Sequence, residues 1–304
     1  MMNAFSQYFG RVLLVGIALI FCSCNLNQDT PINQWNDFIE VRKGTIPLLL
    51  VAAHGGDLKP QWIADRACSG AVVTQDQYTL GIALQIEQEL NRMGFQPYMI
   101  LAKIHRVKVD LNRSLVTSHC DDDTSNELWE LFHSQIAAFR EEVIQKHQRG
   151  LLIDIHGHGH PIQRIELGYL LTSDQLREIA DNATSIDVAA TSIRNLLNNH
   201  PVGISLNEVI VGENSLGTRL EENGFPTVPS ANDPAPNQND PFFSGGTNTK
   251  RYGSKSSVGV DAIQLELNRH GLRSESDDRS RFARVFAETI IEFMEYHYAD
   301  VFSP

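Results

Sequence analysis

The fold is decided by residues 46–57, which read IPLLLVAAHGGD. Residues 46–53 form a short apolar run without alternation, which is typical of a strand buried on both faces of a parallel sheet. The run ends at His54, and two glycines and Asp57 follow. Because open α/β sheets bind their ligands beyond the carboxyl ends of their strands, this stretch predicts an α/β fold with His54 at the ligand-binding edge.

Strands and helices are expected to alternate along the rest of the chain. Apolar periodicity predicts helices at residues 74–93, 128–143 and 282–293, and strands at residues 97–102, 151–155 and 258–267. This alternation predicts right-handed βαβ units and a mainly parallel or mixed central sheet with helices on both faces. Residues 226–255 are rich in Pro, Asn, Asp and Gly, so we expect a long irregular loop of the kind that often covers an active site.

The charge of the chain argues against nucleic acid as a partner. The formal net charge is −12 over 304 residues, and no long run of Lys or Arg occurs. Nucleic-acid binding depends on cationic neutralisation of phosphates, so we expect a small-molecule or short-peptide substrate instead. A negatively charged protein captures an acidic substrate only through local arginines.

The first residues have the composition of an export signal. Arg11 precedes the apolar run 12–21, which is short for a membrane span and is followed by small residues and Cys24. We therefore predict a signal peptide over residues 1–24 with lipidation at Cys24; an uncleaved N-terminal anchor is the alternative. Either would place the protein outside the cytoplasm, and lipidation would anchor it to a bacterial membrane. Residues 25–37 are expected to form a polar tether, and residues 38–304 a single catalytic domain.

Two further cysteines, Cys68 and Cys120, would remain in the mature chain beside Cys24. An oxidising compartment permits a disulfide between them. Two buried free thiols are the other interpretation, and the sequence leaves both open.

Two histidine-containing segments predict a metal site. His54 and Asp57 stand three residues apart on a turn, and residues 151–160 read LLIDIHGHGH. Strand alternation places His156 on the same face as Asp154, a candidate hydrogen-bonding partner. His158 and His160 are alternative metal ligands to His156. We favour His156 because it lies nearest the rigid strand end. Catalytic zinc commonly takes three nitrogen or oxygen ligands and leaves a position for water, so we predict Zn²⁺ bound by His54, Asp57 and His156.

Three charged residues suit the chemistry of such a site. Glu266 ends the predicted strand 258–267 and could act as the general base for the attacking water; a salt bridge to Arg269 or Arg273 is the structural alternative. Arg106 and Arg113 follow another predicted strand. One could polarise the scissile carbonyl and the other could bind a substrate carboxylate in a bidentate fork.

Four motifs together resemble the N-formylglutamate amidohydrolase family. They are DLNR at residues 110–113, DIH at 154–156, FSGG at 243–246 and AIQLELNR at 262–269. The resemblance implies the zinc carboxypeptidase and aspartoacylase fold, in which the first metal motif is His-x-x-Glu; here Asp57 stands at the position of that Glu. By the same match Asn112 and Arg113 would hold a substrate carboxylate, and Glu266 would be the general base.

The resemblance implies hydrolysis of a short acyl amide of an acidic amino acid. Breakdown of N-formylglutamate is intracellular in that family, whereas an exported lipoprotein would not meet that pool. An N-acyl amino acid, a short peptide or a cell-wall fragment with a free carboxylate is therefore an equal candidate. The alternative from another functional class is a non-catalytic lipoprotein that binds carboxylated ligands.

Overall fold

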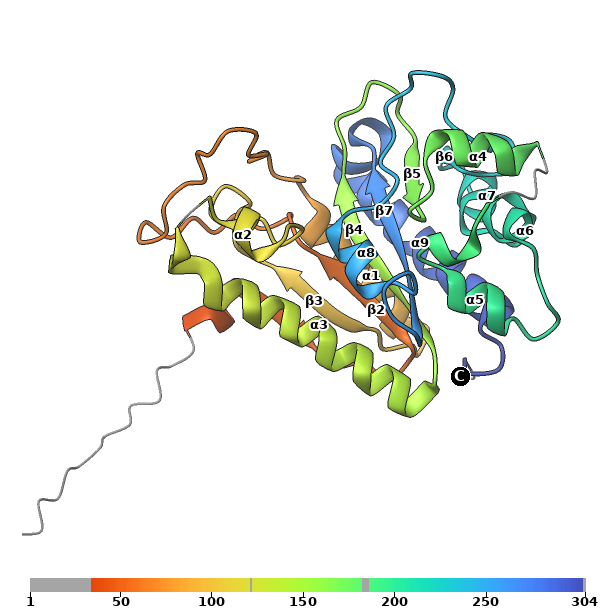
Figure 1. The fold of residues 1–304 in the computed structure, drawn as a ribbon, viewed down its shortest axis with the longest axis horizontal. Helices are drawn as coiled ribbons and strands as arrows, with labels where there is room; N and C mark the ends of the chain where they lie inside the picture. Colours follow the sequence, from red (N-terminus) through yellow and green to blue (C-terminus); the bar gives the residue numbers. More distant parts are fainter. Residues whose placement is uncertain (1–33, 121, 182–185, 303–304) are drawn as a thin grey trace, which may run out of the picture. The chain divides into compact units, whose positions relative to one another are not determined.

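A seven-stranded mixed sheet lies at the centre of the part of the chain that the structure describes (Figure 1). The structure is a computed structural model, and it describes residues 34–120, 122–181 and 186–302. The strand order is β1-β3-β2-β4-β7-β5-β6. The strands are β1 (Ile39–Arg42), β2 (Leu48–Ala52), β3 (Tyr98–Ala102), β4 (Gly150–Gly157), β5 (Ile165–Gly168), β6 (Thr227–Val228) and β7 (Val260–Leu267).

The four central strands, β3, β2, β4 and β7, run parallel to one another. The antiparallel pairs lie toward the two edges, where β1 pairs with β3 and β5 pairs with β7. The predicted mainly parallel or mixed sheet is therefore confirmed. Parallel pairing brings the carboxyl ends of β2, β4 and β7 to one edge of the sheet.

Helices cover both faces of the sheet (Figure 1). The α-helices are α1 (Thr79–Arg92), α2 (Leu115–Ser118), α3 (Asn126–His147), α4 (Ser173–Ala180), α5 (Arg194–Asn199), α6 (Leu206–Val211), α7 (Leu216–Glu222), α8 (Thr247–Tyr252) and α9 (Ser276–His297). Short helical segments are η1 (Gln34–Phe38), η2 (Asp123–Ser125), η3 (Val188–Ala190) and η4 (Arg269–Arg273). Among the described residues, no helix is long and apolar enough to cross a membrane.

Strand alternation divides the buried apolar side chains into two cores. On one face, Leu48 and Leu50 of β2 pack with apolar residues of α1 and α9. On the other face, Leu49 and Val51 pack with apolar residues of α3. Every residue of β2 is buried, as expected for a central strand covered on both faces.

The described residues begin at Gln34, four residues before the domain start that we expected at Phe38. Trp35 in η1 is buried, and its indole Nε1 donates a hydrogen bond to Glu127 Oε2 of α3 at 2.7 Å. Trp35, within the predicted tether, therefore packs against the folded part of the chain. The predicted signal peptide, Cys24 and the remainder of the tether lie outside the described residues.

The loop expected at residues 226–255 is irregular except for β6 and α8. Residues 243–246 of this loop run beside β5: the Phe243 amide donates to Glu166, and the Leu170 amide donates to the Ser244 carbonyl. The loop thereby contributes to the ligand-binding edge of the sheet, as predicted for a loop that covers a site.

Candidate metal centre and active site

Three predicted site residues lie together at the carboxyl edge of the three adjacent strands β2, β4 and β7. His54 follows β2, His156 lies near the end of β4, and Glu266 lies near the end of β7. His156 and Glu266 are direct partners in the β4–β7 pairing, so their side chains leave the sheet on the same face. All three side chains are buried.

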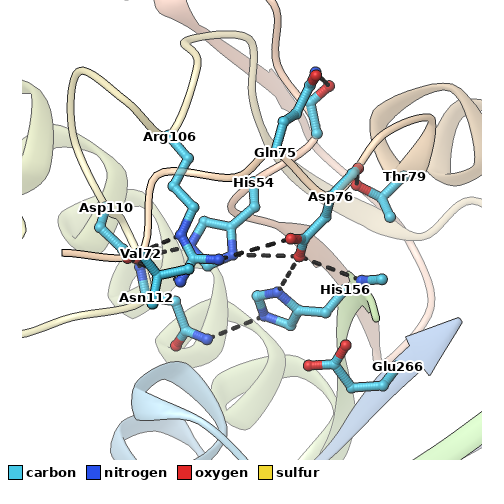
Figure 2. A network of polar contacts seen from close by, with 12 residues as sticks. His54, Val72, Gln75, Asp76, Thr79, Arg106, Asp110, Asn112, His156 and Glu266 are labelled. Atoms are coloured by element: carbon cyan, nitrogen blue, oxygen red, sulfur yellow. Dashed lines mark hydrogen bonds and ion pairs between the residues drawn. The ribbon is translucent and has the colours of Figure 1, made fainter. Parts of the chain in front are cut away.

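Asp76 is the carboxylate that joins the two histidines (Figure 2). Its Oδ2 atom lies 3.3 Å from His54 Nδ1 and 3.0 Å from His156 Nδ1. The Gly157 amide donates to the same oxygen at 3.2 Å. His54, Asp76 and His156 thus place three ligand atoms within 4.8 Å of one another, which is the spacing that a single metal ion requires.

The backbone around the start of α1 fixes Asp76 beside His54. The Asp76 amide donates to the His54 carbonyl at 3.1 Å, and Thr79 Oγ1 donates to the Asp76 carbonyl at 2.8 Å. Gln75 bonds to the carbonyls of Gly55 and Gly56. The helix that follows a parallel strand starts at the carboxyl edge of the sheet, so an acidic residue just before that helix reaches the site.

Asp57, the carboxylate expected to complete the metal site, does not join this group. It is exposed, and its Oδ1 accepts a hydrogen bond from Gln75 at 2.7 Å. A Cβ atom at Gly56 would lie 2.1 Å from the carbonyl carbon of Lys103, so only glycine allows this close approach. Leu58 then bonds to Lys103, which carries the chain away from His54. The structure therefore assigns Asp76 the place that we expected for Asp57.

Further carboxylates orient the outer nitrogens of the two imidazoles. His54 Nε2 lies 2.7 Å from Asp110 Oδ1, and His156 Nε2 lies 3.2 Å from Asp154 Oδ1. At His54, the carboxylate at Nε2 favours a proton on that nitrogen, which leaves the Nδ1 lone pair for a metal. Asp154 lies beside His156 as expected from strand alternation, but its Oδ1 makes no hydrogen bond among the described residues, whereas Asp110 bonds to His54.

Arg106 holds the Asp110 carboxylate. Its Nε and Nη2 atoms both lie 2.9 Å from Asp110 Oδ2, and Nη1 lies 3.7 Å from Asp76 Oδ1. Most of the guanidinium is thus used inside the protein. This geometry favours a positioning role for Arg106 over polarisation of a substrate carbonyl.

The buried charges of the site favour a bound cation. Burial opposes ionisation of Asp76, but the imidazoles of His54 and His156 outweigh it and hold the pKa of Asp76 well below its usual range. Burial likewise lowers the pKa of His156, but Asp154 and Asp76 outweigh it and raise that pKa well above 6.5. The carboxylates thus demand positive charge, and two imidazoles with one carboxylate are a donor set that suits zinc. The residues present therefore fit the predicted metal.

Glu266 is held close to this centre without joining it. Burial raises the pKa of its carboxyl group to about 8, and the nearby His156 works in the opposite direction. Gln264 Nε2 donates to Glu266 Oε1 at 2.9 Å. No salt bridge joins Glu266 to Arg269 or Arg273 among the described residues, so the structural alternative to a general base finds no support.

Both ring nitrogens of His158 form hydrogen bonds with backbone groups. Its Nε2 donates to the Arg164 carbonyl at 2.8 Å, and its Nδ1 accepts from the His160 amide at 3.1 Å. Neither nitrogen is left for a metal. His156 rather than His158 shares Asp76 with His54, and this placement favours His156 as a metal ligand.

The remaining predicted residues surround one cavity of about 790 Å³. Asn112 is buried, and its Nδ2 lies 3.1 Å from His156 Nε2. Arg113 is partly buried and bonds to the Asn112 carbonyl through Nη1. Arg273 donates to the carbonyls of Leu267, Gln77 and His158, so its guanidinium is fully engaged. Arg113 and the exposed Arg269 are the arginines of this cavity that can face a ligand.

A disulfide joins Cys68 to Cys120, with the two Cα atoms 5.4 Å apart. Of the two possibilities left open by the sequence, the structure contains the disulfide. It links the irregular segment that leads to Asp76 with the segment that follows Arg113.

The chain is similar to several solved structures. The N-formylglutamate amidohydrolase from Ralstonia eutropha JMP134 matches with a TM-score of 0.52 and 12% identity over 87% of this chain and 99% of its own. A gene product of Agrobacterium tumefaciens matches with a TM-score of 0.48 and 15% identity over 85% and 95% of the two chains. The N-acetylmuramyl-L-alanine amidase Ami1 from Mycobacterium smegmatis matches with a TM-score of 0.37 and 11% identity over 81% and 96%.

No protein-family model and no curated protein sequence matches the chain. The Ralstonia comparison shows the fold, and at this level it confirms the resemblance that the four sequence motifs predicted.

Proposed function

We propose that the protein is a zinc-dependent hydrolase that cleaves an amide bond in a small carboxylated substrate, an N-acyl amino acid or a short peptide. The observation that carries this proposal is the group of His54, Asp76 and His156 with Glu266 beside it on the neighbouring strand. A fold shared with a protein named as an N-formylglutamate amidohydrolase supports the same class of reaction.

The metal would be held by Nδ1 of both histidines and by the Asp76 carboxylate. Asp110 and Asp154 would keep the two rings in the orientation that the metal needs. Bound zinc supplies a Lewis acid for the scissile carbonyl and for the attacking water.

Glu266 is the proposed general base. A carboxylate that lies beside the metal group can accept a proton from the attacking water and release it to the amine as the C–N bond breaks. The bond from Gln264 fixes one carboxylate oxygen and leaves the other for the proton transfer.

Arg113 is the proposed binding residue for the substrate carboxylate, supported by Asn112. Asn112 Oδ1 accepts from the Asn248 amide at 2.8 Å, and this bond fixes the amide side chain at the cavity wall. Arg113 keeps nitrogen atoms that make no bond to the described residues, so a guanidinium fork is available to a ligand.

Turnover by a Glu266→Gln variant tests this proposal. Wild-type protein loaded with zinc should release amine from members of a panel of N-acyl amino acids and dipeptides. The variant should keep its zinc and its melting temperature but lose about two to four orders of magnitude in kcat, because an amide cannot accept the proton. Zinc binding without turnover of any amide would favour the non-catalytic binding protein, and near-native kcat in the variant would return Glu266 to a structural role.

We also propose that the protein is exported and anchored through Cys24. The apolar run that precedes Cys24 supports an export signal. The disulfide between Cys68 and Cys120 supports an oxidising compartment, because cytosolic thiols are kept reduced.

A further inference from the structure

The imidazole of His160 reaches the cavity from the side of Glu266 where β5 lies. Glu166 of β5 is the direct partner of Glu266 in the β5–β7 pairing, so both side chains lie on one face of the sheet. Glu166 is completely buried, and its Oε1 lies 2.7 Å from His160 Nδ1. Its Oε2 accepts from the Phe243 amide at 2.8 Å. The carboxylate thus has both oxygens engaged and holds the His160 ring in place.

His160 is also fixed through its ring face. It stacks on Phe243 with ring centroids 4.6 Å apart and an interplanar angle of 16°. Both side chains line the cavity, and the imidazole is partly exposed. Nε2 makes no hydrogen bond to any residue that the structure describes. An imidazole with one nitrogen on a buried carboxylate and the other open to a cavity is arranged to contact a ligand.

A second metal site is the competing interpretation, since His158, His160 and Glu166 also place ligand atoms within 4.8 Å of one another. The hydrogen bonds oppose it. Both nitrogens of His158 are used by backbone groups, and both oxygens of Glu166 have donors. A metal would have to break these bonds, whereas a ligand contact at His160 Nε2 breaks none.

The position of His160 indicates which part of a substrate it meets. In sheet order, His54 follows β2, His156 lies on β4, Glu266 lies on β7 and Glu166 lies on β5. Three strand spacings separate the first from the last, roughly 14 Å. Arg113 lines the cavity and belongs to the segment after β3, a strand that lies beyond β2 in the sheet order when counted from β5. A substrate with its carboxylate at Arg113 and its amide at Glu266 would therefore extend its acyl part toward His160.

We propose that His160, held as an imidazolium by the buried carboxylate of Glu166, is a specificity-determining residue whose Nε2–H donates a hydrogen bond to an oxygen acceptor on the acyl part of the substrate. The preferred acyl group is then longer than formyl and carries a carboxylate or carbonyl oxygen, as in a dicarboxylic acyl amino acid or a peptide. Glu166 and Phe243 act through His160 as positioning residues. This inference rests on the proposed amide hydrolysis for its substrate, but its contact can be measured without turnover.

Two matched ligands and two matched variants test the contact. The ligands are N-succinylglutamate and N-pentanoylglutamate, which have acyl groups of similar length with and without a terminal carboxylate. His160→Asn keeps a polar atom near the Nδ1 position, where it can still meet Glu166, but leaves nothing at Nε2. His160→Gln reaches toward the Nε2 position instead. Dissociation constants are measured by calorimetry on zinc-loaded protein in a Glu266→Gln background, and kcat and KM in the wild-type background.

The parent protein should prefer the succinyl ligand by about ten- to a hundredfold, the usual effect of a hydrogen bond to a charged group. His160→Asn should abolish this preference and raise KM for the succinyl substrate, with kcat, zinc content of one per chain and melting temperature unchanged. His160→Gln should restore part of the preference for the succinyl ligand. Glu166→Gln, which can still accept from the imidazole, should weaken the preference through KM rather than kcat.

Three results would overturn the inference: a preference that survives in His160→Asn, a parent protein that binds neither ligand, or a second zinc lost on replacing His160. Binding with the expected preference but without turnover would instead refute the amide hydrolase alone. Turnover that ignores His160 would refute the inference alone.

Discussion

Replacement of Asp76 by Asn should empty the metal site, whereas the same change at Asp57 should leave it intact. Asp76 Oδ2 lies within 3.3 Å of Nδ1 on both histidines, while Asp57 is exposed and bonds to Gln75. Loss of an outer hydrogen-bonding partner of a metal ligand typically costs about ten- to a hundredfold in metal affinity. Loss of a charged direct ligand should cost more, so we expect Asp76→Asn to weaken zinc binding by more than about a hundredfold, or about 2.7 kcal/mol.

A third variant makes the expected order of effects specific. Asp110 contacts the outer nitrogen of His54 at 2.7 Å and would not touch the metal. Asp110→Asn should therefore weaken zinc binding by about ten- to a hundredfold, between the effects at Asp76 and Asp57. This ranking distinguishes direct ligation from a general loss of negative charge, because all three variants remove one charge.

Zinc affinity is measured by competition with a chromophoric chelator at constant pH, because metal binding releases protons. Thermal unfolding of the zinc-free proteins serves as the control for folding. A large loss in Asp57→Asn with a small loss in Asp76→Asn would refute the assignment and restore the ligand set expected from the sequence. Equal losses in all three variants would show that the effect is electrostatic only.

Two further predictions concern the substrate and the anchor. Arg113→Ala should lower kcat/KM by about ten- to a hundredfold for substrates with a free carboxylate and hardly at all for their methyl esters, because the guanidinium fork has no partner in the ester; Arg113→Lys should not rescue it fully. Equal losses on acids and esters would mean that Arg113 supports the site without reading the carboxylate. Cys24→Ala in the full chain should move the protein out of the detergent-extractable membrane fraction or block its processing, and wild-type protein found in the cytoplasm with its N-terminus intact would refute the export proposal.

The central sheet could be predicted because its parallel strands are continuous apolar runs. β2, β3, β4 and β7 all lie within or beside the expected ranges. β1 and β5 were missed because each is only four residues long and contains charged residues, so neither forms a continuous apolar run. Their antiparallel pairing to β3 and β7 depends on contacts between distant parts of the chain, and local sequence does not encode such contacts.

His54, His156 and Glu266 could be found because each ends an apolar strand. Asp76 could not be found in this way, since it follows a long segment without helix or strand that separates it from β2. The signal for it was available in the predicted helix at residues 74–93, whose start must lie at the same edge of the sheet as His54. His160 and Glu166 depend on β5, and the missed strand hid their relation to Glu266.

The candidate site therefore has two parts, one positioned by the sheet and one positioned by the irregular segment before α1. His156 and Glu266 lie on paired strands and His54 follows β2, whereas Asp76 lies at the end of an irregular segment that other side chains hold in place. Arg66 of that segment donates to the Val72 and Arg106 carbonyls, and the disulfide at Cys68 ties the segment to Cys120.

These links connect the Asp76 segment to the chain that carries Arg106 and Asp110, which orient His54. The disulfide joins cysteines 52 residues apart in the sequence. It limits the conformations of the unfolded chain and stabilises a segment that lacks regular hydrogen bonding. A reducing compartment would remove that constraint from the half of the site that contains the proposed carboxylate ligand. An oxidising compartment keeps this disulfide formed, and the disulfide supports both the proposed export and a preformed metal site.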